Sequence, residues 1–177
     1  MKLSEILTRA AAITGLDDVS VSVPSVTLTK LTDCANTVYS ELVLEHIPLK
    51  NKEDITFTGG KAFYSDFRYR VREVLSVKVR GVKTPFVMYP AYVEAEGAEG
   101  GAEVEYLFHP GTLEADDDVI LPPQFSEYVM AIGVASEYYY RLGYIEEAEF
   151  YKARFDNAVY NLSRRLKSFR IPPRRFV

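Results

Sequence analysis

The chain of 177 residues has little cysteine and histidine and no tryptophan. A single cysteine, Cys34, excludes an intrachain disulfide framework and a zinc site built from several cysteines. Two histidines, His46 and His109, leave little for a histidine-based metal centre. No apolar run approaches the roughly 20 residues that a membrane-spanning helix needs. Hydrophobic residues make up 47% of the chain and charged residues 26%, which is typical of a globular protein and excludes disorder over the whole length.

The sequence also lacks the common signatures of an active site. The segment Gly59-Gly60-Lys61 has neither the upstream glycine nor the Lys-Ser/Thr pair of a phosphate-binding loop. Cys34 and His46 lie about 18 Å apart along one predicted helix, too far for a catalytic pair. The acidic run Asp116–Asp118 precedes a predicted helix, and N-terminal capping explains it better than metal binding. We therefore expect no enzymatic activity, no cofactor and no metal site.

Charge is distributed unevenly along the chain. The last 26 residues, from Lys152 to Val177, contain eight basic residues against one acid, whereas Glu94 to Asp118 contains nine acids and no lysine or arginine. A solvated loop and a basic helix end would each produce such a segment. Both segments together favour a directed interaction between a basic end and an acidic partner or nucleic acid.

Hydrophobic periodicity predicts four helices. Lys2–Thr14 and Thr29–His46 carry apolar residues at steps of three and four. A third helix, with Pro122 and Pro123 in its first turn, ends at Gly143. The fourth begins near Tyr144–Glu146, and the short connection predicts an antiparallel hairpin. The fourth helix has a near-heptad stripe, which needs an apolar partner, formed by Ala148, Tyr151, Phe155, Ala158, Leu162, Leu166 and Phe169.

The middle of the chain predicts about four or five strands, with short extended pieces around Gly59-Gly60 and further strands at Val71–Val79, Phe86–Val93 and Ala102–Phe108. In Val71–Val79 we expect Val77 on one face and Val74 on the other. The predicted fold is therefore α+β, a four-helix bundle with a small antiparallel β-module inserted between helices 2 and 3. The bundle comprises residues 1–50 and 110–169, the β-module 51–109, and an extended basic C-terminal tail 170–177.

Tyrosine is abundant, with 13 residues, and suits surfaces that are half buried, such as subunit interfaces. Consecutive tyrosines such as Tyr138-Tyr139-Tyr140 spread around a helix, so those outside the core need a second covering surface. Stacking on nucleic-acid bases is an alternative, but contact between subunits is the preferred interpretation. We assign Tyr138, Tyr140 and Tyr144 to a subunit interface.

The C-terminal third resembles the last two helices and tail of the head–tail connector (adaptor, head-completion) proteins of tailed bacteriophages. In that family, a helix of small residues ends at a glycine, and an EEA-containing helix and a basic tail closing in Arg-Arg-aromatic follow. The matching residues are Gly143, Glu146, Glu147, Ala148, Tyr151, Arg154, Phe155, Ala158, Arg174, Arg175 and Phe176. The resemblance covers about 55 residues of the chain.

The resemblance implies a structural virion protein rather than an enzyme. Copies would form a ring, typically a dodecamer, under the portal protein at the head–tail interface, after assembly in the host cytoplasm. The ring would extend the channel through which double-stranded DNA passes during ejection, without sequence-specific binding. It would also contact a downstream neck or tail protein, and no membrane.

We expect the basic C-terminus to dock on the portal protein. The prolines hold the tail extended, arginines contact carboxylates, and an aromatic ring anchors in an apolar pocket. The residues assigned to this contact are Arg164, Arg165, Lys167, Arg170, Arg174, Arg175 and Phe176. The alternative is a nucleic-acid-binding or DNA-packaging accessory protein acting through the same basic end. A small enzyme or regulatory domain is a third class, for which the sequence has no recognisable motif.

Overall fold

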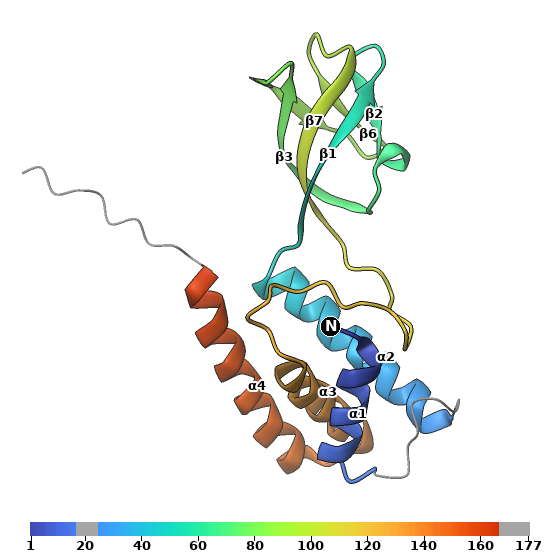
Figure 1. Cartoon of the computed structure of the whole chain (residues 1–177), viewed down its shortest axis with the longest axis vertical. Coiled ribbons are helices and arrows are strands. Elements are labelled where there is room, and N and C mark those ends of the chain that lie inside the picture. Colours follow the sequence, from blue (N-terminus) through green and yellow to red (C-terminus); the bar gives the residue numbers. More distant parts are fainter. Residues whose placement is uncertain (17–24, 167–177) are drawn as a thin grey trace, which may run out of the picture. The chain divides into compact units, whose positions relative to one another are not determined.

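A computed structural model of the chain describes residues 1–16 and 25–166, with side chains up to residue 163. Within these residues, two α-helices precede and two follow a run of seven strands (Figure 1). The helices are α1 (Leu3–Ile13), α2 (Val26–Glu41), α3 (Glu127–Leu142) and α4 (Ile145–Leu166). The strands are β1 (Lys50–Phe57), β2 (Lys61–Phe63), β3 (Val71–Val79), β4 (Val82–Thr84), β5 (Phe86–Met88), β6 (Tyr92–Ala95) and β7 (Gly100–Phe108). A π-helical turn, Leu42–His46, continues α2, and a 3-10 turn, Tyr64–Asp66, follows β2.

The chain divides into two compact units. The helical unit comprises Met1–Tyr39 and Leu113–Val177, and the β unit comprises Ser40–Thr112. The prediction of an α+β fold with the strands between the second and third helices is confirmed. The prediction of a four-helix bundle with a small β-module is wrong, because the strands form two antiparallel sheets in a compact unit of their own.

The helical unit is built around α3, which explains why it is not a four-helix bundle. In such a bundle each helix buries one stripe and exposes the opposite face. In α3, every residue from Met130 to Ser136 is buried, and the helix packs along both α1 and α4 (Figure 1). A Cβ atom on Gly133 would lie 2.8 Å from Val38 Cγ1 of α2 and 2.9 Å from Phe155 Cε2 of α4. Neighbours therefore surround α3 on several sides.

The ends of α3 differ in how well the sequence predicts them. Gly143 ends the helix in a left-handed conformation with φ of 82°, as a glycine at this position does in many helices. The start is later than predicted, because Pro122 and Pro123 lie in a turn and α3 begins at Glu127. Among the described residues, no helix combines the length and apolar character needed to cross a membrane.

The β unit contains a four-stranded sheet in the order β1-β7-β3-β4 and a three-stranded sheet in the order β2-β6-β5. A turn with Gly59 and Gly60 at positive φ joins β1 to β2. Further along the chain, Pro85 alone separates β4 from β5. The chain thus passes from one sheet to the other at both places, and the aromatic residues Phe57, Phe67, Tyr106 and Phe108 are buried in the unit.

Strand β3 does not alternate as its sequence predicts. The prediction placed Val74 and Val77 on opposite faces, but both are buried. The pairing with β7 shifts register between Val74 and Ser76, and an extra residue in a strand reverses the faces that follow it. At this irregularity the Val74 N–H donates to Met88 Sδ of β5 at 3.4 Å. A side chain therefore accepts the hydrogen bond of this backbone N–H.

Candidate functional site

The three tyrosines predicted for a subunit interface have different surroundings. Tyr138 is only 8% exposed, so its ring belongs to the interior of the helical unit. Tyr140 and Tyr144 are 62% and 55% exposed. The structure therefore leaves two of the three predicted side chains accessible to a partner, and Tyr138 is not included in the candidate surface below.

A cluster of exposed apolar side chains lies where α3 turns into α4. Five large residues within this stretch are between 45% and 62% exposed, and we call them the hairpin tip: Tyr140, Leu142, Tyr144, Ile145 and Phe150. Scattered apolar residues are normal on a protein surface, but several large ones at one helix–helix connection make it a candidate site of protein contact. Tyrosine and phenylalanine are also enriched at the centre of such contacts.

Backbone hydrogen bonds fix the hairpin tip. The Gly143 N–H donates to the Tyr140 carbonyl at 3.1 Å, and the Tyr144 N–H donates to the Tyr139 carbonyl at 3.0 Å. The first turn of α4 then closes with the Ala148 N–H donating to the Tyr144 carbonyl at 3.0 Å. In the interior, the Ser136 hydroxyl donates to the Ala148 carbonyl at 2.9 Å and ties the two helices together.

Aromatic contacts hold the exposed rings in place. Tyr139 and Tyr151 stack with centroids 5.7 Å apart and an interplanar angle of 9°. Tyr144 meets Tyr139 at 6.2 Å, and Phe150 meets Tyr151 at 5.2 Å, both in edge-to-face geometry. Burial raises the pKa of the Tyr139 phenol. Rings that are already oriented lose less conformational entropy when a partner covers them.

Polar contacts border the hairpin tip. Arg141 forms an ion pair with Glu137 one turn earlier, at 2.9 Å between Nε and Oε1. The Arg154 guanidinium lies 5.6 Å from the centroid of the Phe150 ring and donates to the Tyr128 hydroxyl at 2.9 Å. An apolar centre with arginines at its margin has the composition of a protein–protein interface.

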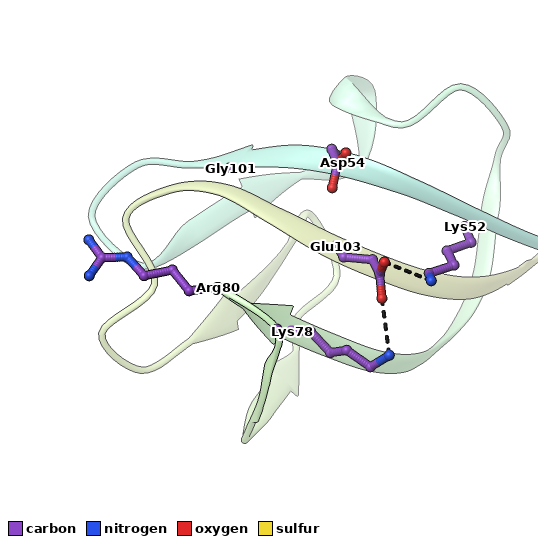
Figure 2. A pocket seen from close by; sticks show the side chains of 7 residues that line it. Lys52, Asp54, Lys78, Arg80, Gly101 and Glu103 are labelled. Carbon is purple, nitrogen blue, oxygen red and sulfur yellow. Dashed lines mark hydrogen bonds and ion pairs between the residues drawn. The ribbon is translucent and has the colours of Figure 1, made fainter.

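A second candidate is a charged hollow on the four-stranded sheet (Figure 2). The hollow has a volume of about 460 Å³ and is lined by Lys52, Asp54, Lys78, Arg80, Gly81, Gly101 and Glu103. Glu103 bridges three strands, with its carboxylate 2.6 Å from Lys52 Nζ and 3.1 Å from Lys78 Nζ. The hydrogen bond from Lys52 and then that from Lys78 lower the pKa of Glu103. Because the carboxylate balances both lysines, this arrangement suits a surface ion-pair ladder better than an anion site.

The basic residues predicted to dock on the portal protein lie at or beyond the end of the described chain. Arg164 and Arg165 fall in the last turns of α4, but their side chains are not described. Lys167, Arg170, Arg174, Arg175 and Phe176 lie outside the described residues. The assignment of all seven to a portal contact stays a prediction.

Of the residues considered as catalytic or metal-binding candidates, Cys34 is buried and Asp118 forms ion pairs. Cys34 is fully buried, and desolvation raises the pKa of its thiol to about 11, which leaves little thiolate at neutral pH. The prediction that Asp116–Asp118 cap the following helix is wrong, because α3 starts at Glu127. Asp118 instead lies 3.8 Å from the N-terminal amine and 3.8 Å from Lys2 Nζ. No group of three or more potential metal ligands occurs in the described parts of the chain.

Sequence reasoning missed the apolar half of the hairpin tip. Leu142, the last residue of α3, is apolar and yet 45% exposed. Phe150 lies off the heptad stripe of α4, and a large apolar residue off the stripe was the available signal. No protein-family model matches the chain, and no curated protein matches it by sequence.

Proposed function

We propose that the protein is a structural component of the head–tail connector of a tailed bacteriophage. Copies of the chain form a ring beneath the portal protein and extend the channel for the DNA. The resemblance of the C-terminal third to connector proteins suggests this class. The observation that carries the proposal is the hairpin tip, which presents a preorganised apolar surface on the same helical hairpin.

The hairpin tip suits the geometry of a ring. A closed ring needs head-to-tail contacts, in which a patch on one copy meets a different patch on the next. Tyr144 and Phe150 are oriented by their ring contacts with Tyr139 and Tyr151. Such aromatic anchors contribute a large share of the binding energy of an interface when a partner encloses them. In this proposal the basic C-terminus, beginning at Arg164, makes the contact with the portal protein.

The test compares assembly of the full chain and of a hairpin-tip variant, Tyr144→Ser/Phe150→Ser. Light scattering coupled to size exclusion measures the mass of each protein alone and with the portal protein encoded in the same genome. We expect the natural chain to form a multimeric complex with the portal, and the variant to lose it while its melting temperature stays nearly unchanged.

The matched control is Val26→Ser/Val82→Ser, which removes two apolar side chains that are 73% and 69% exposed outside the hairpin. It should assemble as the natural chain does. A hairpin-tip variant that still forms the full multimeric complex with the portal would contradict the proposal, because a tail bound to the portal does not join the copies to one another. A natural chain that ignores the portal but binds duplex DNA with strong salt dependence would instead support the accessory-protein alternative.

A further inference from the structure

Three aromatic side chains lie side by side on the outer face of the three-stranded sheet. Phe63 of β2 meets Tyr92 of β6 with centroids 5.9 Å apart, and Tyr92 stacks on Tyr89, just past the end of β5, at 4.8 Å. Phe63 is 52% exposed and Tyr89 is 40% exposed. The row therefore crosses all three strands and presents ring surface to the outside of the β unit.

Strand register places these rings outward. Phe63 pairs with Tyr92 across β2 and β6, while the neighbouring pair Ala62 and Val93 is fully buried. Alternation along a strand sends successive side chains to opposite faces. The Tyr89 N–H donates to the Tyr92 carbonyl at 2.8 Å and extends the pairing by one residue. The interior of the β unit is thus filled by other residues, and this row is left on the surface.

An acidic and apolar hollow continues the row along β6. It has a volume of about 320 Å³ and is lined by Pro85, Phe86, Val87, Glu94 and Glu96. The negative charge of Glu94 is the largest cause that raises the pKa of the nearby Tyr89 phenol. Lys61 Nζ lies 4.9 Å from the centroid of the Tyr92 ring, at the edge of the row. Along β6, from Tyr92 toward Glu96, the surface therefore presents aromatic rings and then carboxylates.

This order of groups fits a basic segment that contains proline. Proline-rich segments dock in their extended helical form on aromatic surfaces, and carboxylates beside the rings receive arginines. Lys61 pairs with Glu94 across β2 and β6, so the site holds two carboxylates against one lysine. This net negative charge disfavours nucleic acid, because it repels phosphates. The residues Arg170–Val177, RIPPRRFV, have this composition, with paired prolines followed by two arginines and a phenylalanine.

The spacing of the segment also agrees with the surface. From Tyr92 to Glu96 the chain covers about 13 Å at the rise of a strand. From Pro172 to Phe176 a polyproline-type segment covers about 12 Å. With the prolines on the rings, Arg174 and Arg175 would reach the two carboxylates and Phe176 would reach the hollow beside Val87, which pairs with Glu94.

We propose that the outer face of the three-stranded sheet binds the C-terminal segment, Arg170–Val177, of another copy of the protein. A contact between two different patches on successive copies is head-to-tail, as a ring requires. The proposal goes beyond the portal contact of the same segment and needs no portal protein. Because both contacts use the same residues, one segment makes one of them at a time.

The first test measures binding of a labelled synthetic peptide, residues 168–177, to a chain truncated after Phe169. Fluorescence anisotropy should show saturable binding that unlabelled peptide competes away. Glu94→Gln/Glu96→Gln in the truncated chain should weaken binding about tenfold or more, as should Arg174→Ala/Arg175→Ala in the peptide. The control Glu73→Gln, an exposed acid on the other sheet, should leave binding unchanged. No saturable binding, or equal binding to the Glu94/Glu96 variant, would overturn the proposal.

The second test asks whether the contact joins two copies. A full chain carrying Glu94→Lys/Glu96→Lys keeps its tail and loses its acceptor face, and the truncated chain keeps the face and lacks the tail. Both chains also carry Tyr144→Ser/Phe150→Ser, so that the hairpin tip joins no copies. Neither should associate alone, and a mixture should form a complex of two chains by native mass spectrometry. A mixture that stays monomeric while the peptide binds would place the segment on its own copy and overturn the proposed contact. Failure here leaves the portal assembly test unaffected.

Discussion

The helical unit and the β unit differ in the residues that lie at the centre of each. At the centre of the helical unit, α3 buries Ala131, Gly133, Ala135 and Ser136. The β unit is filled by rings, with Phe67 edge-to-face on Tyr106 at 5.1 Å and Tyr106 against Phe108 at 6.4 Å.

The difference follows from how closely the backbones approach. Small residues let helices pack closely, and the side chains of Val38 and Phe155 lie directly against Gly133. Two sheets packed face to face leave about 10 Å between them, which large side chains must fill. The helical unit buries rings such as Phe155 beside this centre, whereas Phe150 of the same helix is exposed on its surface.

The largest expected effect tests this close packing. Phe155 of α4 is 4% exposed and contacts the surface of α3 at Gly133. Phe155→Ala should lower the free energy of unfolding by about 3–5 kcal/mol, because a rigid interior cannot collapse onto the missing ring. Urea denaturation followed by circular dichroism measures it.

The matched control is Phe150→Ala on the same helix, where the ring is 58% exposed. It should change the free energy of unfolding by less than about 1 kcal/mol. Equal costs at the two positions would contradict the division of α4 into a buried and an exposed face.

A smaller effect is expected from adding one methyl group at the crossing of α2, α3 and α4. The Cβ atom of Gly133→Ala would lie within 2.9 Å of both Val38 Cγ1 and Phe155 Cε2. Overpacking costs about 1–3 kcal/mol, and the better helix propensity of alanine offsets about 1 kcal/mol of it. Thermal unfolding should show a net loss for this variant.

Gly111→Ala is the control, because a Cβ atom there meets nothing within 4 Å. Its free energy of unfolding should be unchanged or slightly higher. If Gly133→Ala were more stable than the natural chain, the side chains of Val38 and Phe155 would have moved aside at little cost, which would contradict close packing at the crossing.

The helices were largely predictable from the sequence, because the helical period of 3.6 residues stays visible even where a predicted helix end is a few residues wrong. The stripe of α4 is confirmed at Ala148 and Phe155, which are buried. Tyr151, Ala158 and Leu162 are half-buried, and the side chain of Leu166 and all of Phe169 lie outside the described parts. In α3, alanine, glycine and serine carry little hydrophobic signal, yet every residue from Met130 to Ser136 is buried, the small ones included. A helix enclosed on several sides has no stripe to detect.

The β unit was harder to predict. The range Val71–Val79 matches β3, but the irregularity after Val74 reverses the inward face within it. β4 was missed because three residues are too few for a period of two to be visible. The predicted strand Phe86–Val93 is two strands, β5 and β6, separated by residues 89–91. The aromatic row on the outer sheet face depends on this pairing, so the sequence pattern did not indicate it.

The smallest expected effect concerns the charged outer face of the four-stranded sheet. Glu103 of β7 contacts Lys52 of β1 and Lys78 of β3, but exposed ion pairs contribute little to stability. The pKa of Glu103 is lowered in the folded protein, first by the hydrogen bond from Lys52. A carboxylate with a lowered folded pKa stabilises the fold above its unfolded pKa, and this stabilisation is lost as the pH falls through the folded pKa.

Glu103→Gln should therefore melt slightly below the natural chain at pH 7, with the smallest shift of the three variants. The difference should shrink as the pH falls below about 4, the ordinary range of a glutamate, and it should also shrink in 1 M salt, which screens exposed charges. Differential scanning calorimetry at several pH values measures both trends. A difference that persists at low pH and high salt would show that Glu103 stabilises the sheet by packing instead of by charge. The surface of the β unit would then be stabilised by side-chain packing, as its interior is.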